Sequence, residues 1–202
     1  MGKIAARIDE NRQDGGIPIL NITQQPDANI CVIGIDPGRK NCGYAVLGLD
    51  GERTYPLLAH GEVDLSTQKG KKALCATLSA WAASTDWRCL GVVCEGRWYG
   101  HRAGVSASIG QQIQAGQDEV RGLVCGYSEA LGLRLLPTIQ AGTAKLALAA
   151  YGHVTKEQMR KVSRFRWQVD LSEHEADAAG VALAALQRWE RERLKGRAVP
   201  HF

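Results

Sequence analysis

Acidic residues close apolar segments at three places in the chain, and a histidine accompanies one of them. Asp36 ends a short apolar run rich in β-branched residues, and Glu95 ends another. His174 and Asp177 stand three residues apart near the start of a segment with helical character, so they share one helix face. A carboxylate at the edge of an apolar core is unfavourable unless something pairs with it. Because no lysine or arginine lies within these short segments, a bound cation is a candidate partner.

A divalent cation would satisfy the three carboxylates together. Asp36, Glu95 and Asp177 contribute three negative charges. Two magnesium ions would more than balance them and leave positive charge for phosphate oxygens. This is the charge balance of two-metal phosphodiester hydrolysis, in which paired ions bracket the attacking and leaving oxygens. The pattern therefore favours a nuclease, provided that the three segments meet in space.

Each of these residues also has an ordinary structural explanation. Asp36 begins the sequence Asp-Pro-Gly, which is common in turns. Glu95 precedes Gly96 and could lie in a surface loop. His174 and Asp177 could simply favour the positive end of a helix dipole. The functional interpretation rests on the combination of residues, in this order and on these elements.

The elements that must position these residues alternate between strand and helix. Apolar runs bounded by turn residues predict five strands, over Ile30–Ile35, Gly43–Leu47, Tyr55–Val63, Cys89–Cys94 and Leu133–Leu136. Helical spacing predicts helices over 70–86, 104–131, 140–151, 155–167 and 172–195. This order indicates an α/β fold with a mixed five-stranded sheet flanked by helices.

Composition bounds the class of protein. The chain has 202 residues, of which 45% are hydrophobic and 23% charged, as in ordinary globular domains rather than disordered chains. We predict a flexible N-terminal extension over 1–28, rich in polar residues, glycine and proline, and one nuclease domain over 29–202. No apolar run is long enough to cross a membrane, and the start of the chain lacks the apolar stretch of a signal peptide.

The six cysteines are scattered and include no C-x-x-C pair, which argues against a disulfide scaffold and against a zinc site. We therefore expect a reduced compartment, and for a nuclease one that contains DNA, such as the cytoplasm of a bacterial cell, for a cellular or phage-encoded protein. The net charge of +4 permits nucleic-acid binding without arguing for it.

Two groups of basic and aromatic residues are candidates for contact with nucleic acid. One group could form a basic helix face and consists of Lys156, Arg160, Lys161 and Arg164. The other follows Glu95 and consists of Arg97, Trp98, Tyr99 and Arg102. Aromatic rings stack on exposed bases and arginines contact phosphate. A solvated helix face, and aromatic rings packed beneath their loop, are the ordinary alternatives.

The motifs, taken in order, resemble those of RuvC-type Holliday junction resolvases. They are Val32–Gly38 (VIGIDPG) followed by Gly43 and Tyr44, Glu95 at a strand end, the small residues of Ser106–Gln111, the lysine-containing Thr155–Met159, and His174–Ala178 (HEADA). The resemblance covers roughly residues 30–190. It implies a ribonuclease H-like fold and the activity of a crossover junction endodeoxyribonuclease in recombination and repair.

The resemblance also implies roles for individual residues. The metal ligands and catalytic residues would be Asp36, Glu95, His174 and Asp177, with two Mg²⁺ ions per site, and Lys156 would stabilise charge in the transition state. The aromatic that stacks on an unpaired base at the junction centre would be Trp98.

The histidine is the departure to note, because many members of the family have an aspartate, and some a histidine, where this chain has His174. Imidazole suits later transition metals, so we expect Mn²⁺ to support activity at least as well as Mg²⁺. Alternatively, His174 transfers a proton to the leaving oxygen. Glu173 or Glu175 would serve as the fourth carboxylate if the register differs.

A four-way junction has two equivalent strands to cut, so a twofold homodimer would present two sites. The predicted helix 104–131, with small residues along it, could pack against a copy of itself or within one chain. Two alternatives to a junction resolvase remain open at this point. One is a nuclease of the same fold acting on other branched DNA or RNA-containing substrates, and the other is a non-catalytic nucleic-acid-binding protein. A sugar-kinase or actin-like enzyme would need a second phosphate loop and about twice the length.

Overall fold

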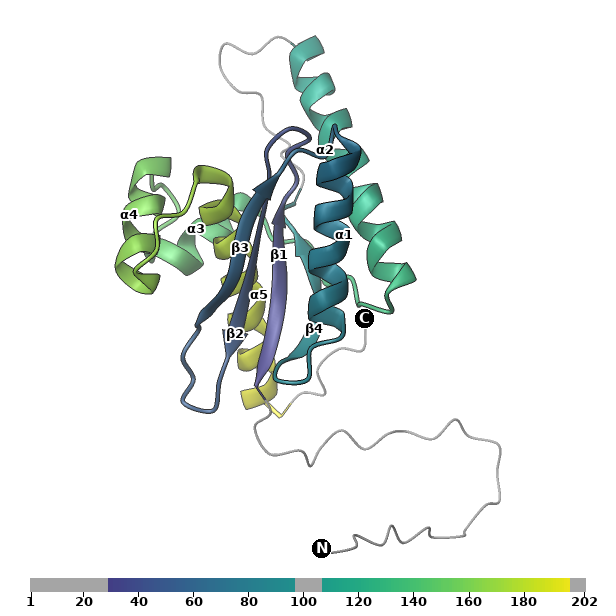
Figure 1. Cartoon of the computed structure of the whole chain (residues 1–202). Coiled ribbons are helices and arrows are strands. Elements are labelled where there is room, and N and C mark those ends of the chain that lie inside the picture. The colour runs from purple at the N-terminus through teal and green to yellow at the C-terminus, as the bar shows by residue number, and fades with distance from the viewer. Residues whose placement is uncertain (1–28, 97–106, 197–202) are drawn as a thin grey trace, which may run out of the picture.

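The computed structural model describes residues 29–96 and 107–196, which build a layered α/β fold (Figure 1). Its centre is a sheet of four strands in the order β3-β2-β1-β4. The strands are β1 (Ile30–Asp36), β2 (Cys42–Leu49), β3 (Leu57–Val63) and β4 (Arg88–Cys94). β2 pairs antiparallel with both β1 and β3, whereas β4 lies parallel to β1. The predicted mixed sheet is thereby confirmed.

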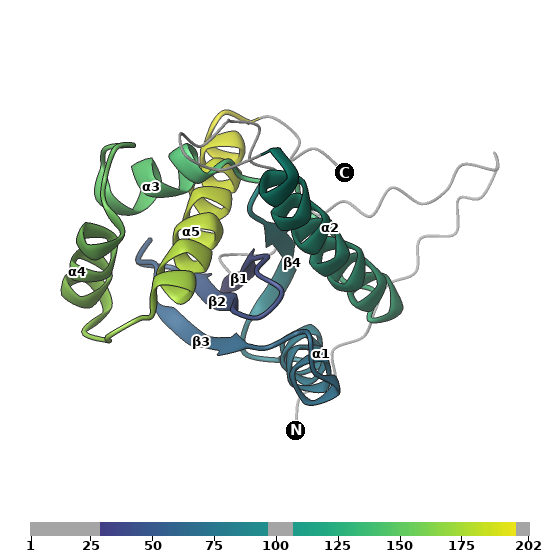
Figure 2. The same ribbon diagram turned by 90° about the horizontal axis from the view of Figure 1, so that it is seen from above.

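Helices cover both faces of the sheet (Figure 2). The helices α5 (Glu173–Leu194), α3 (Ala141–Ala149) and α4 (Lys156–Trp167) lie on one side, with α5 directly against β1 and β2. The helices α1 (Gln68–Ala82) and α2 (Ala107–Ala130) lie on the other side. The predicted helices are confirmed, with ends that differ by a few residues. No helix in the described residues is both long enough and apolar enough to span a membrane.

β1 is one of the two interior strands of the sheet and is buried along its whole length. Its side chains alternate between two cores, as the strand repeat requires. Ile30 and Val32 join the core under α5, whereas Ile33 and Ile35 join the core under α1 and α2. The sequence prediction of a strand buried on both faces is therefore confirmed. Asp36 follows this apolar run as the last residue of the strand.

Glycines let α5 approach the sheet more closely than side chains would allow. A Cβ at Gly34 of β1 would overlap the backbone oxygen of Ala178, and a Cβ at Gly43 of β2 would overlap that of His174. The helix contributes small side chains at the same contact, among them the fully buried Ala182. This contact fixes the height of the first turns of α5 above the ends of β1 and β2.

The expected fifth strand over Leu133–Leu136 is wrong, because the segment makes only isolated bridges to β4. Leu136 N–H donates to the Val92 carbonyl at 2.8 Å, as in a parallel ladder, but the next bond to Cys94 comes from Ile139 at 3.2 Å. The pairing therefore slips by one residue after Pro137, whose ring holds φ near −65°, away from the value typical of parallel strands. A run of leucines gave the strand pattern without the regular pairing.

Two further expectations concern the cysteines and the N-terminal segment. The six cysteines are free thiols, as expected. The proposed extension over 1–28 lies outside the described residues.

The packing of α5 predicts that Gly34→Ala is strongly destabilising. The new methyl group must push α5 from the sheet, and overpacking of this kind costs about 1–3 kcal/mol. Gly51→Ala is the matched control, because a Cβ there meets nothing within 4 Å and a change within about 0.5 kcal/mol is expected. Urea unfolding of the wild type and the two variants measures both effects on the free energy of unfolding. Equal stability of the two variants would contradict the close contact.

Candidate active site

The four predicted acidic and histidine positions meet at one end of the sheet. Because β1 and β4 are parallel, Asp36 and Glu95 leave the sheet at the same edge, and Glu95 N–H donates to the Ile35 carbonyl at 2.9 Å. The first two turns of α5 bring His174 and Asp177 to this edge. His174 Nδ1 lies 2.7 Å from Asp36 Oδ2. The structure therefore joins residues that are up to 141 positions apart in the sequence.

Burial and mutual repulsion perturb the acids of this group. Burial raises the pKa of Glu95 to about 8, helped by the nearby charges of Asp36 and Asp177 and by a hydrogen bond with Asp36. Burial also raises the pKa of Asp177 to about 6, and the charge of Asp36 adds to this effect. The Asp36 carboxylate accepts a hydrogen bond from the His174 ring, which favours the protonated imidazole and raises the pKa of His174. Three carboxylates held this close resist simultaneous ionisation, and a cation would relieve that resistance.

The chemistry of these side chains suits a divalent cation. Carboxylate oxygens are the ligands that Mg²⁺ prefers, and an imidazole nitrogen broadens the set towards transition metals. Within residues 29–96 and 107–196, no three aspartate, glutamate, histidine or cysteine side chains are arranged to hold one ion as they stand. His174 Nδ1 is engaged with Asp36 instead. The donor types and their repulsion fit a cation site, and the side chains would have to adjust to form one.

A network from β3 anchors the start of α5. Ser172 caps the helix and exchanges hydrogen bonds with Glu175, which forms a capping box. His60 Nδ1 lies 2.8 Å from Glu175 Oε1, and the Ser172 hydroxyl donates to Glu62 Oε2 at 2.7 Å. Glu175 thus serves the helix cap and β3, not the cluster around Asp36. The sequence signals for these contacts were the Ser-x-x-Glu spacing and the alternating polar residues of β3, which the sequence analysis missed.

Two lysines lie near the carboxylates. Lys156 forms an ion pair with Glu173, the neighbour of His174, and its charge lowers the pKa of Asp177. Lys145 of α3 has the same effect on Asp177, and the sequence analysis did not single it out. The sequence marks Lys145 only as a member of α3, the helix that packs on α5. The site is therefore acidic at its centre with cationic neighbours on one side.

The other predicted cations of α4 have partners within the protein. Lys161 pairs with Glu157 at 2.7 Å and Arg164 with Asp170 at 3.6 Å, and all four side chains are exposed. Arg160 Nε donates to the Leu171 carbonyl at 2.9 Å, which ties α4 to the segment before α5. Exposed pairs of this kind contribute little to stability, so these side chains are free to exchange partners with a polyanion.

The predicted loop residues after Glu95 are outside the described part of the chain. These are Arg97, Trp98, Tyr99 and Arg102. Their suggested contacts with DNA therefore stay a prediction from the sequence.

The fold is shared with solved RuvC structures. Thermus thermophilus RuvC in complex with a Holliday junction substrate matches with a TM-score of 0.61 at 22% identity, over 79% of this chain and 95% of that one. A second T. thermophilus RuvC structure gives 0.55 at 22% identity over 85% and 99%. The yeast mitochondrial Holliday junction resolvase Ydc2 gives 0.50 at 14% identity over 82% and 81%. No protein-family model and no curated protein matches the sequence. The resemblance found in the motifs is thus confirmed at the level of the fold.

The raised pKa of Glu95 predicts how stability depends on pH when divalent cations are chelated. Folding lifts this pKa from 4.5 to about 8, so the folded protein binds a proton more tightly than the unfolded chain. The contribution of Glu95 to stability is therefore complete below pH 4.5 and is lost as the pH rises through 8. In EDTA, Glu95→Gln should be more stable than the wild type at pH 8, by about 1–3 kcal/mol, and the difference should shrink towards pH 5.

Denaturant unfolding at both pH values measures this difference. Glu129→Gln, at an exposed position of α2, controls for the loss of a carboxylate elsewhere. An equally stable or less stable Glu95→Gln protein at pH 8 in EDTA would contradict the described electrostatics.

Proposed function

We propose that this protein is a divalent-cation-dependent endonuclease that resolves four-way DNA junctions. The observation that carries the proposal is the meeting of Asp36, Glu95 and Asp177 with His174 at one edge of the sheet. This cluster lies in a fold that is shared with RuvC, one structure of which contains a Holliday junction substrate.

The residues of the cluster would hold a pair of Mg²⁺ ions between them. When bound, such ions neutralise phosphate charge and lower the pKa of water, which makes hydroxide available near neutral pH. Asp36 and Asp177 would contribute carboxylate oxygens from β1 and α5, and Glu95 from the end of β4. The burial that raises the pKa of Glu95 also excludes water, which strengthens the interaction of these carboxylates with a cation.

His174 can serve the reaction in either of two ways. Its bond to Asp36 fixes the ring at the site and favours the protonated form, so the imidazolium could give a proton to the leaving oxygen. As a nitrogen ligand, it would favour Mn²⁺, and we propose that Mn²⁺ supports cleavage at least as well as Mg²⁺. The ratio of rates in the two ions separates a ligand from a proton donor.

The cations beside the cluster would hold the DNA strand that is cut. Lys156 stands next to the site and would stabilise charge that develops on phosphate. Arg160, Lys161 and Arg164 continue along α4 and would contact the phosphate backbone. From the sequence, the residues Arg97, Trp98, Tyr99 and Arg102 would bind the junction centre.

We also propose a homodimer, so that two sites face the two equivalent strands of a junction. Ile109 and Ile113 lie one turn apart on α2 and are 52% and 54% exposed, so one face of this helix presents two large apolar side chains to solvent. Figure 1 shows that this end of α2 extends past the sheet. A partner helix would cover both side chains.

Cleavage of defined DNA substrates tests the proposal. Wild type, Asp36→Asn and Asp50→Asn would be incubated with a synthetic four-way junction, a fork and a linear duplex, each with and without Mg²⁺. We expect metal-dependent cleavage of the junction in preference to the duplex, and a loss of at least about 100-fold in Asp36→Asn. Asp50 lies in the hairpin between β2 and β3, so Asp50→Asn should cleave as the wild type does.

Other outcomes would identify a different function. Equal cleavage of junction and duplex would reject a resolvase, and preference for the fork would indicate another branched substrate. Cleavage without metal by both wild type and Asp36→Asn would reject the site itself.

A further inference from the structure

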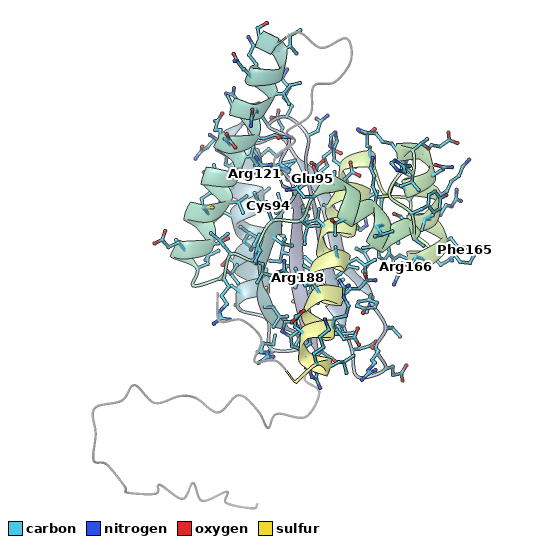
Figure 3. The ribbon with its side chains drawn as sticks, turned by 180° about the vertical axis from the view of Figure 1, so that it is seen from behind. Cys94, Glu95, Arg121, Phe165, Arg166 and Arg188 are labelled. Atoms are coloured by element: carbon cyan, nitrogen blue, oxygen red, sulfur yellow. The ribbon has the colours of Figure 1, made fainter. Side chains whose placement is uncertain are left out.

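Arg121 lies on α2 and reaches the end of β4 beside the acidic cluster. Its Nε and Nη2 atoms donate to the backbone carbonyl of Glu95 at 3.2 and 2.9 Å. Its Nη1 atom donates to Asp118 Oδ1 at 3.1 Å, one turn earlier in the same helix. The Arg121 side chain is only 13% exposed, so it is not placed to bind a phosphate in solvent. Figure 3 shows Arg121 and Glu95 side by side at this end of the sheet.

Arg121 contacts the backbone directly after the end of β4, at the residue whose carboxylate belongs to the acidic cluster. The Glu95 N–H donates to the Ile35 carbonyl at 2.9 Å, and the Gly96 N–H donates to the Ile139 carbonyl at 2.7 Å. The Glu95 carbonyl accepts from Arg121, so all three backbone groups around Glu95 are hydrogen-bonded. A guanidinium suits this task, since its planar fork can place two N–H groups on one oxygen and a third on Asp118.

We propose that Arg121 is a positioning residue that fixes the peptide of Glu95, and thereby aims its carboxylate at the cation site of the proposed nuclease. The inference rests on the proposed function for its catalytic meaning, but the fixation itself does not. Asp118 sets the plane of the guanidinium, because its carboxylate takes the third N–H group. The charge of Arg121 also partly offsets the repulsion that Glu95 experiences from Asp36 and Asp177.

Two measurements on Arg121→Gln test the role, and neither requires cleavage. Hydrogen–deuterium exchange of the backbone amides of Glu95 and Gly96 should become about tenfold faster, because the end of β4 opens locally. The dissociation constant for Mn²⁺, measured by calorimetry on the full chain, should rise about tenfold or more, as is typical when the residue that orients a metal ligand is removed.

A conservative variant and a control variant separate the role of Arg121 from a general loss of an arginine. Arg121→Lys keeps the charge but donates from one nitrogen, so it should restore part of the Mn²⁺ affinity. Arg191→Gln is the matched control, because Arg191 is exposed and donates to the Gln187 carbonyl at 3.1 Å at the far end of α5. Its amide exchange at Glu95 and its Mn²⁺ affinity should equal those of the wild type.

The outcomes separate this inference from the proposed function. Unchanged amide exchange at Glu95 and Gly96 in Arg121→Gln overturns the positioning role, whatever the cleavage assay gives. Faster exchange throughout the protein, with Mn²⁺ affinity unchanged, would indicate a purely structural residue and also overturns it. If the wild type binds Mn²⁺ and cuts no junction, the proposed function fails while these two measurements still decide the role of Arg121.

Discussion

The close contact between α5 and the sheet is the constraint on which the rest of the structure depends. At Gly34 and Gly43, the backbone of α5 occupies the space that a side chain on β1 or β2 would fill. Because the helix lies this low, His174 reaches Asp36 at 2.7 Å and Asp177 comes within electrostatic range of Asp36 and Glu95. A larger residue at either glycine would lift the helix and separate the site, so the packing of the core and the geometry of the site have one cause.

The second constraint is electrostatic. The chain carries a net charge of only +4, yet three carboxylates share one edge of the sheet, and two of them have a raised pKa. Contacts around the carboxylates keep their elements in place. These are the capping box of α5, the contacts from β3 and the hydrogen bonds of Arg121 to the Glu95 carbonyl. Lys156 and Lys145 offset part of the repulsion at Asp177. A small net charge thus conceals an acidic cluster with cationic neighbours, an arrangement that suits the proposed cation-dependent nuclease.

Much of this arrangement was predictable from the sequence, because local patterns determine it. Alternation and apolar runs placed β1 and β4, and the position of Asp36 and Glu95 at their ends followed directly. The prediction of a fifth strand was wrong because the leucines before Pro137 have the apolar pattern of a strand. Regular pairing depends on backbone angles, which composition does not reveal. Long-range partners such as His60 with Glu175 and Arg121 with Glu95 were missed, since they join residues 115 and 26 positions apart through the tertiary fold.

The proposed chemistry depends most on whether Asp36, Glu95, His174 and Asp177 bind divalent cations together. Crystals of the full chain grown with Mn²⁺ would test it directly, because manganese scatters anomalously and its position can be found without assumptions about the ligands. We expect anomalous peaks between Asp36, Glu95 and Asp177 in the wild type, and their loss in Asp36→Asn crystals. Mn²⁺ bound elsewhere, with these carboxylates still in contact only with one another and with His174, would contradict it.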